Sequence, residues 1–449
     1  MSTANVLSLI SSAKSKVFRK LWLKRRLATT GLFETSWQEV SKHVLKWGSV
    51  KNGVDYVRQS KFTSNEMIIS MSNESGFFND ETYESSFWYG YANQQRTLVK
   101  IDAGFVHQTQ SSSGIWTNTE LPTLPTLFIG FIQGDIMASD KNTIGLPAKP
   151  LTQVFRDFPC RNVLGWTSTG VTASQFFTMI WNMTDGAGQP IFRPFFQDTL
   201  TYWQVTTTSA VYTQLNTSTA DEVNDKSVWD IFEKLAEAED FLLYVSPIGA
   251  LTFRNRNSNT TTAQFQYYGG NYLNNTYGKT IKKIDSYGKK TSNYYSRVEV
   301  KWQDTSASSA IRSTQASYLV SGSNTAWNLG FKTLKIENLW IATATAADTI
   351  ANNVFQNVSV LKNEITFTTQ FTPMTNVLDR VSVSYDTGKQ AQDSLWDLKN
   401  WEGSTLSSDD LIWYKSGSDV IFFDAANFKI LNIDINLDNL ECKFVGIEI

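Results

Sequence analysis

A group of acidic side chains near the middle of the chain has the residue types and the close spacing that could do chemistry. Its members are Glu233, Glu237, Glu239 and Asp240. Paired carboxylates are sufficient for the acid and base steps of glycoside hydrolysis. Acidic residues also gather on the solvated faces of ordinary helices. Because these four lie at the end of a segment with helical periodicity, we expect them to face solvent and not to cleave a bond.

Histidine and cysteine are too few for most other catalytic designs. The chain has two histidines, His43 and His107, and two cysteines, Cys160 and Cys442. Hydrolase triads and zinc sites need clusters that these residues do not supply. The sequence also lacks a phosphate-binding loop, a dinucleotide fingerprint and a nucleophile elbow. We therefore expect no enzyme activity, no catalytic residue, no metal, no cofactor and two buried thiols.

A basic cluster between residues 14 and 26 is the most distinctive charged feature. In segment 7–27 the apolar residues fall at helical spacing, which predicts a basic N-terminal helix. Such a helix face can dock on an acidic partner, a phosphate or a membrane surface, and it is also typical of a helix that is simply solvated. The candidate docking residues are Lys20, Arg25 and Arg26.

Aromatic residues are abundant and charged residues are scarce. The chain has 15 Trp, 17 Tyr and 28 Phe, and 18% of its residues are charged, against about 25% in an average protein. Exposed aromatic rings serve sugar-binding modules, but they are equally typical of cores and protein interfaces, where charge is depleted. The low charge favours interfaces. The candidate aromatic contacts are Trp88 and Trp116.

Length and charge set the class of protein. With 449 residues and 50.7 kDa, the chain is too long for one hydrophobic core, so we expect several domains. The net charge of −2 offers no field for a polyanion, and we expect no sequence-specific nucleic-acid binding. Neither a membrane span nor a signal peptide can be recognised, which predicts synthesis in a cytoplasm.

Hydrophobic periodicity predicts a mainly β chain with an α+β insert. Helices are predicted at 228–237, where Ser227 and Asp230 resemble a capping box, and at 346–361. A hairpin is predicted to follow the first helix, at 241–254. Residues 141–150, which contain Gly145 and two prolines, predict a linker or long loop. Strand patterns occur at 66–72, 96–102, 127–136, 296–302, 364–371, 380–385, 428–435 and 440–449.

Short motifs follow one another in a defined order over roughly residues 30 to 449. They begin with the segment 32–41, and Asn73-Glu-Ser-Gly76 then precedes two phenylalanines. Next come the strand 127–132, the helix and hairpin of the middle region, the strand 297–302, the second helix and a late Asp-Arg-Val strand. This order resembles the tail hub proteins (baseplate hub or tail-tip proteins) of tailed bacteriophages. One departure is Leu378, which stands where a glycine often precedes the aspartate of the last motif.

The resemblance implies a structural virion protein at the distal end of the tail tube. It implies a homotrimer in which each chain contributes two tube-like β-barrel domains, so that a sixfold tube continues into a threefold tip and the DNA ejection channel is closed. The implied partners are tail tube and distal tail proteins, the tape measure protein, and central fibre or spike proteins. The implied location is the virion tail tip, after synthesis in the bacterial host cytoplasm. The expected division is 1–30 basic helix, 31–150 first barrel, 151–300 mixed α+β region, and 301–449 second barrel with a helix.

Two other functions remain open from the sequence. A receptor-binding or carbohydrate-binding tail protein that mediates host attachment would use the same aromatic residues on an exposed face. A glycan depolymerase would use paired carboxylates, although the repeated motifs of β-helix depolymerases are absent. Binding of host glycans would favour the first, and release of reducing ends from a host polysaccharide would favour the second.

Overall fold

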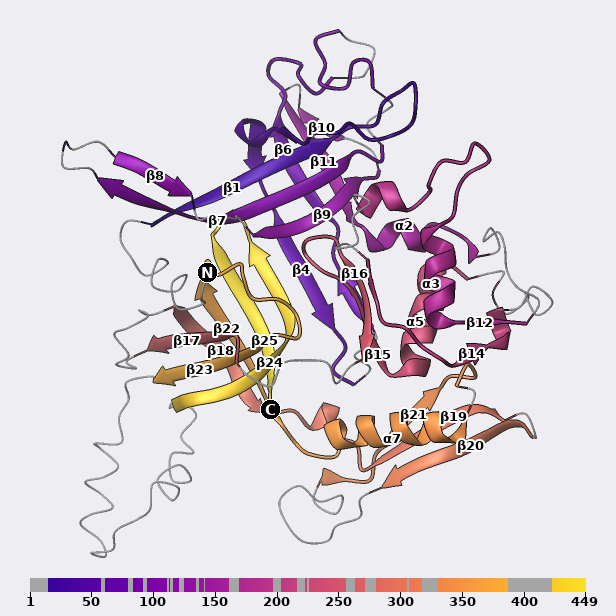
Figure 1. Cartoon of the computed structure of the whole chain (residues 1–449). Helices are drawn as coiled ribbons and strands as arrows, with labels where there is room; N and C mark the ends of the chain where they lie inside the picture. The colour runs from indigo at the N-terminus through magenta and orange to yellow at the C-terminus, as the bar shows by residue number, and fades with distance from the viewer. Residues whose placement is uncertain are drawn as a thin grey trace, which may run out of the picture.

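The computed structural model shows a mainly β protein with an α+β insert, which confirms the predicted fold class (Figure 1). It contains a half-barrel sheet, a closed six-stranded barrel and two smaller units of helices and strands. The structure describes residues 15–57, 61–79, 84–91, 95–110, 113, 116–120, 125–134, 137–140, 142–160, 169–196, 203–215, 223, 226–255, 263–270, 280–304, 307–316, 329–341, 343–386 and 422–449.

The N-terminal sheet is a half-barrel of nine strands. Its main path is β2-β1-β7-β9-β11-β6-β3, with β8 paired to β7 and β10 to β11. The hairpin of β7 and β8 extends away from the rest of the molecule (Figure 1). The strands are β1 (Ser15–Lys24), β2 (Gln38–Glu39), β3 (Val44–Lys46), β6 (Met67–Ser72), β7 (Leu98–Gln110), β8 (Trp116–Glu120), β9 (Thr126–Ile132), β10 (Met137–Asp140) and β11 (Thr143–Pro150).

The predicted basic N-terminal helix is wrong, because residues 15–24 form strand β1. Residues 1–14 of that prediction lie outside the described residues. β1 pairs antiparallel with β7 along its whole length. Leu21 and Leu23 are fully buried and stand two residues apart, which is the period of a strand. The tertiary pairing with β7 therefore outweighs the helical spacing of the apolar residues.

The predicted linker at 141–150 is also wrong, because residues 143–150 form strand β11. Ile144, Leu146 and Ala148 alternate inward and are buried. β11 pairs with β6 on one side and with β9 on the other. Pro147 cannot donate a hydrogen bond, but its carbonyl accepts one from the Gln133 N–H at 3.1 Å. Proline is thus accommodated at a position of the sheet where its missing N–H is tolerated.

The C-terminal sheet closes into a six-stranded barrel. Closure follows from β23, which pairs parallel with β17 and antiparallel with β24. Three aromatic rings from different strands pack together in the core, Tyr267, Phe367 and Phe444, with centroids 5.3 to 5.7 Å apart. The strands are β17 (Phe265–Gly270), β18 (Ile281–Lys289), β22 (Asn363–Gln370), β23 (Arg380–Asp386), β24 (Phe422–Asn436) and β25 (Glu441–Glu448).

A hairpin from the N-terminal half completes this second sheet. β4 (Ser49–Val54) pairs antiparallel with residues 432–436 of β24, and β5 (Phe62–Ser64) pairs with β4. In Figure 1, β4 runs from the region of the half-barrel to the side of β24 and β25. One hydrophobic cluster contains buried residues of both sheets, such as Ile101 and Phe444. The two β units are therefore joined by main-chain hydrogen bonds and by a shared core.

The middle region is the α+β insert, and its predicted helix and hairpin are confirmed. Ser227 and Asp230 form the capping box at the start of α5, with Asp in place of the usual Glu. The rings of Phe177 in α3 and Phe232 in α5 stack with centroids 3.9 Å apart. The elements are α2 (Thr152–Arg156), β12 (Val171–Thr172), α3 (Ala173–Trp181), β13 (Trp203–Val205), β14 (Val211–Tyr212), α5 (Val228–Glu239), β15 (Phe241–Val245) and β16 (Leu251–Asn255).

The second predicted helix is confirmed as α7 (Ala344–Val358), but it lies outside the barrel. It packs on a separate three-stranded sheet of β19 (Arg297–Asp304), β20 (Ala307–Ala316) and β21 (Thr333–Glu337). The barrel takes β17 and β18 from residues before 301 and β22 to β25 from residues after 362. The predicted boundary at residue 301 is therefore wrong: it falls inside β19, because the α7 unit is inserted between two strands of the barrel.

A left-handed turn separates β23 from β4 along the same edge of β24. Leu378 has φ 73°, the conformation in which glycine is favoured. Its N–H donates to the Ile430 carbonyl at 2.8 Å, and the Ile430 N–H donates to the Asp379 carbonyl at 2.9 Å. The Leu378 side chain is buried against Val54, Phe62 and Leu242. The departure from glycine noted in the sequence thus supplies an apolar contact at a strained position.

The Asp379 carboxyl beside this turn is largely removed from solvent. Burial raises the pKa of Asp379 to about 6, although the Asn376 N–H, which donates to its Oδ2 at 2.6 Å, and the nearby Arg254 both act to lower it. The ordinary value in an unfolded chain is about 3.9. The folded protein therefore holds this proton more tightly than the unfolded chain does.

We expect replacement of Gly53 by alanine to destabilise the junction of β4 and β24. A Cβ at Gly53 would collide with Asn432 Oδ1, and overpacking of this kind costs about 1 to 3 kcal/mol. The double variant Gly53→Ala with Asn432→Ala should recover part of that loss in urea unfolding, since the colliding atom is gone. Gly288→Ala in β18 is the control, because nothing lies within 4 Å of its new Cβ. Equal losses for the single and double variants would contradict the prediction.

We expect Asp379→Asn to stabilise the protein in a pH-dependent way. Because the pKa of Asp379 is raised on folding, the stability that this group contributes is present at low pH and is lost as pH rises from about 4 through about 6. The asparagine variant does not titrate and keeps the acceptor for the Asn376 N–H. Its free energy of unfolding should match the wild type near pH 4 and exceed it by about 2 to 3 kcal/mol near pH 7.5.

Urea titrations at both pH values measure this difference. Asp348→Asn is the control, since Asp348 is exposed on α7. A stability difference between Asp379→Asn and wild type that is the same at both pH values would contradict the assignment.

Candidate functional site

Arg25, one of the three candidate docking residues, is bound within the chain. Its guanidinium forms an ion pair with Glu34 at 3.0 Å and donates to the Phe87 carbonyl and to the Tyr91 hydroxyl. It also lies over the rings of Phe87 and Tyr91, 4.2 and 3.7 Å from their centroids. The Arg25 and Glu34 side chains are only 14% and 10% exposed. Arg25 therefore connects the end of β1 to the segment around residue 88.

Lys20 and Arg26 lie in different surroundings from Arg25 and from each other. The Lys20 ammonium lies over the rings of Phe18 and Trp22 on β1, 5.1 and 5.7 Å from their centroids. Arg26 lies past the end of β1, where its Nε donates to the Gly31 carbonyl at 3.0 Å. Burial and the nearby Arg96 guanidinium lower the pKa of Arg26. The structure therefore does not bring the three candidates together into one patch.

The two candidate aromatic contacts, Trp88 and Trp116, also lie in different parts of the structure. Trp88 is fully buried and belongs to a cluster of rings with Phe78 and Phe87, so it is a core residue and the prediction of an exposed contact is wrong. His43 stacks on Phe77 in the same cluster, with centroids 4.7 Å apart, and burial lowers the pKa of its imidazole. Trp116 begins β8 opposite Gln110, and its side chain lies outside what the structure describes.

The loop that carries this cluster has the predicted turn. Gly76 has φ 70°, which favours glycine, and its N–H donates to the Asn73 carbonyl at 2.9 Å. Asn73 Oδ1 accepts from the Phe78 N–H at 2.7 Å. The Asn-x-x-Gly turn therefore directs both phenylalanines toward the half-barrel core.

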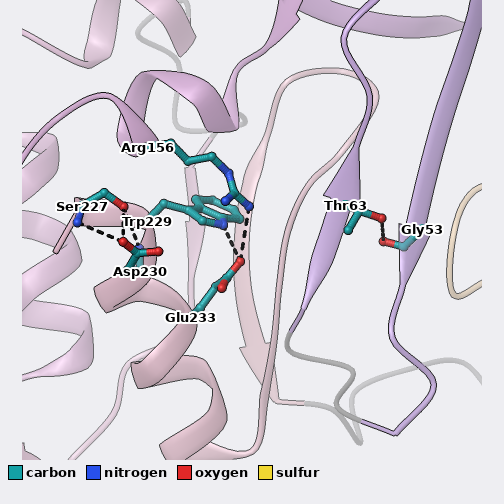
Figure 2. Close-up of polar contacts among 7 residues, drawn as sticks. All are labelled: Gly53, Thr63, Arg156, Ser227, Trp229, Asp230 and Glu233. Atoms are coloured by element: carbon teal, nitrogen blue, oxygen red, sulfur yellow. Dashed lines mark hydrogen bonds and ion pairs between the residues drawn. The ribbon is translucent and has the colours of Figure 1, made fainter.

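The carboxylates at the end of α5 link the helix to other elements, so the expectation that they face solvent is wrong. Glu237 Oε2 accepts from Asn338 Nδ2 at 3.2 Å, and the other three carboxylates make the contacts that follow. Figure 2 shows Glu233 accepting from the Trp229 indole and pairing with Arg156, at 2.6 and 3.4 Å. Glu239 accepts from the Tyr212 hydroxyl at 2.9 Å, and the buried Asp240 accepts from Asn353 Nδ2 at 2.6 Å. Burial raises the pKa of Glu233 and of Glu239.

These contacts give each of the three carboxylates a different neighbour: Arg156 of α2, Tyr212 of β14 and Asn353 of α7. A glycosidase needs two carboxylates on either side of one bond. The observed contacts serve instead to hold the α5 helix against three neighbouring elements.

The two cysteines are buried free thiols, as predicted, and burial raises the pKa of each to about 12. Thiols with such raised pKa values are poor nucleophiles. Among the described residues, no group of three or more His, Cys, Asp or Glu side chains is placed to hold a metal ion. Within the same residues, no helix is long and apolar enough to cross a membrane.

The described surface has sheet edges and exposed apolar side chains through which the protein could bind another protein. The half-barrel ends in the short strands β2 and β3, and a terminal strand presents main-chain groups on its outer side. Leu45 of β3 and Ile68 of the neighbouring β6 are 55% and 53% exposed. The sequence prediction missed this surface, because which strand lies at an edge depends on long-range pairing.

Comparison with known proteins gives neighbours among solved structures alone: no protein-family model and no curated protein matches the chain. The 43 kDa tail protein of prophage MuSo2 from Shewanella oneidensis is 12% identical, with 96% of this chain and 98% of that chain covered and a TM-score of 0.47. The tail protein from Neisseria meningitidis MC58 is 9% identical, with 96% of both chains covered and a TM-score of 0.48.

The prophage tail protein gp18 from Listeria monocytogenes EGD-e is 7% identical, with 95% of this chain and 94% of that chain covered and a TM-score of 0.45. The chain is thus similar to phage tail proteins over nearly its whole length, the same class of protein that the sequence motifs resemble.

We expect Arg25→Met to destabilise the fold. The substitution leaves the largely buried Glu34 without its ion pair, and breaking such a pair costs about 2 to 4 kcal/mol after allowance for its partial exposure. Lys20→Met is the matched control on the same strand, with an expected loss below about 1 kcal/mol. Chemical denaturation of the two variants measures the difference. A loss for Arg25→Met no larger than that for Lys20→Met would contradict a structural role for Arg25.

Proposed function

We propose that this chain is a structural subunit of a phage tail, and more specifically the tail hub at the distal end of the tail tube. The observation that supports it best is the junction of the two β units. β4 leaves the N-terminal half and pairs with β24 of the C-terminal barrel, and one core extends across both sheets. A hub subunit that contributes two units to one ring needs such a fixed relation between them.

In this proposal the two units provide the change of symmetry. Three chains with two β units each supply six similar positions to a sixfold tube, while the rest of each chain follows threefold symmetry. The C-terminal barrel is closed on itself, whereas the N-terminal half-barrel is open at β2 and β3. Open edges are usually covered by pairing with another element. We therefore assign the ring contacts to the half-barrel, and closure of the DNA channel to the assembled trimer.

The proposed partners are those of a hub: tail tube and distal tail proteins, the tape measure protein, and central fibre or spike proteins. The low charge and high aromatic content suit large permanent interfaces. Among the candidate docking residues, Lys20 and Arg26 are the ones we retain for partner contacts, because Arg25 is occupied within the chain. The protein would be made in the bacterial host cytoplasm and carried at the virion tail tip. Its work would be assembly, without the making or breaking of a covalent bond.

The mass of the native assembly tests this proposal. We expect native mass spectrometry of the purified protein, alone or mixed with the tube protein of the same phage, to give a species of three times the 50.7 kDa chain mass. Assembly depends on protomer concentration, so the measurement is made over a concentration series. A monomer that stays monomeric with the tube protein and binds host glycans would instead support the receptor-binding or carbohydrate-binding function.

A further inference from the structure

A cavity of about 300 Å³ lies where the N-terminal half meets the α+β insert. Its walls come from the turn after β1, Arg96 just before β7, the end of α2 and the segment 185–195. The residues that matter for its chemistry are Arg26, Arg96, Asp157, Asp185, Phe33 and Phe195. The cavity therefore combines charged and aromatic walls, which is typical of a site for a specific ligand.

Two arginines provide the positive charge of this cavity. Arg26 and Arg96 line the same cavity, and burial together with the Arg96 charge lowers the pKa of Arg26. Arg26 uses its Nε for the Gly31 carbonyl, and no carboxylate partner of Arg26 is found within the described ranges. Two neighbouring guanidiniums repel each other, and an anion between them would remove that repulsion while accepting charge-assisted hydrogen bonds.

The carboxylates that line the cavity already have partners. Asp157 pairs with Arg96 at 3.6 Å and accepts from Gln133 and Gln153 at 2.8 and 2.7 Å. Asp185 accepts from the main-chain N–H groups of Ala187 and Gln189 in its own loop, both at 2.9 Å. Neither carboxylate forms an observed ion pair with Arg26. Asp185 keeps its charge, since its observed partners are neutral N–H groups, and Arg26 is the arginine of the cavity wall for which the described residues show no ion pair.

Aromatic rings form the apolar wall beside these charges. The rings of Phe33 and Phe195 pack edge to face with their centroids 5.5 Å apart. The ring of Phe195 also packs edge to face on Phe131, with centroids 5.6 Å apart. The Arg96 guanidinium lies over Phe131 and Phe195, 5.1 and 5.8 Å from their centroids. Arg96 has φ 66°, a strained conformation for a residue with a side chain. Its contacts with the rings and with Asp157 hold the guanidinium at the cavity.

We infer that this cavity binds a short acidic segment of a partner protein, with a carboxylate beside Arg26 and Arg96 and an apolar side chain against Phe33 and Phe195. The Arg26 guanidinium, which uses its Nε for the Gly31 carbonyl and for which the described residues show no ion pair, selects the acidic group, and the aromatic wall together with the cavity volume selects a peptide side chain over a bare ion. The inference does not depend on a position in a tail, because the cavity lies within one chain.

Two blocked peptides, Gly-Phe-Glu-Gly and its glutamine analogue Gly-Phe-Gln-Gly, test the inference by isothermal titration with the full chain. We expect the glutamate peptide to bind at least about tenfold more tightly, since hydrogen bonds to charged groups contribute about 1.5 to 3 kcal/mol. Arg26→Met should weaken binding of the glutamate peptide by a similar factor. Lys16→Met is the matched control, because Lys16 is an exposed cation of β1 that does not line the cavity; it should leave binding unchanged.

Several results would overturn the inference. They are equal affinity for the two peptides, unchanged binding by Arg26→Met, absence of binding at millimolar peptide, and acetate binding as tightly as the glutamate peptide, which would reduce the site to one for small anions. A thermal melt of Arg26→Met shows whether that variant is folded. If it is partly unfolded, Arg26→Lys is used as well. Because lysine keeps the charge, Arg26→Lys should bind the glutamate peptide more tightly than Arg26→Met does. Native mass spectrometry of the same variant separates this inference from the hub proposal, since we expect its oligomeric state to equal that of the wild type.

Discussion

The fold depends on how one edge of β24 is divided between two partners. Residues 422–429 pair with β23, which closes the barrel, and residues 432–436 pair with β4, which joins the N-terminal half to it. Between the two, Ile430 exchanges main-chain hydrogen bonds with the Leu378–Asp379 turn. No main-chain group of Ile430 is left unpaired at the change of partner, which a buried strand requires. The left-handed Leu378 and the desolvated Asp379 are the cost of making that change within a few residues.

Much of the fold could be predicted from local pattern, and the errors have a common physical cause. The capping box and apolar stripe of α5 are local, and the structure has both. The prediction of a helix at β1 is wrong because its apolar residues fit a helix as well as a strand. The pairing that decides between the two lies about eighty residues further along, on β7. The same limit applies to β11 and to the boundary at residue 301, where long-range pairing decides.

The candidate site was less predictable than the fold. Charge alone selected Arg25, but its role follows from Glu34, Phe87 and Tyr91, which the sequence does not place beside it. Arg96 and Phe195 were missed, because neither a left-handed arginine nor a cavity between distant segments leaves a local signal. Leu378 is the instructive exception: its departure from glycine in the resembled motif marked a place where the backbone is strained.

The pairing of β4 with β24 also sets an order of events during synthesis. The Trp47 N–H donates to Asp438 Oδ1, a residue 391 positions later in the chain. A ribosome that adds about 5 to 20 residues per second needs on the order of tens of seconds between the two. Until β24 emerges, the hairpin of β4 and β5 has an open edge and the N-terminal sheet lacks part of its core. Folding of the junction is thus a late, non-local step, and until it is complete the open edge can pair with other copies of the chain.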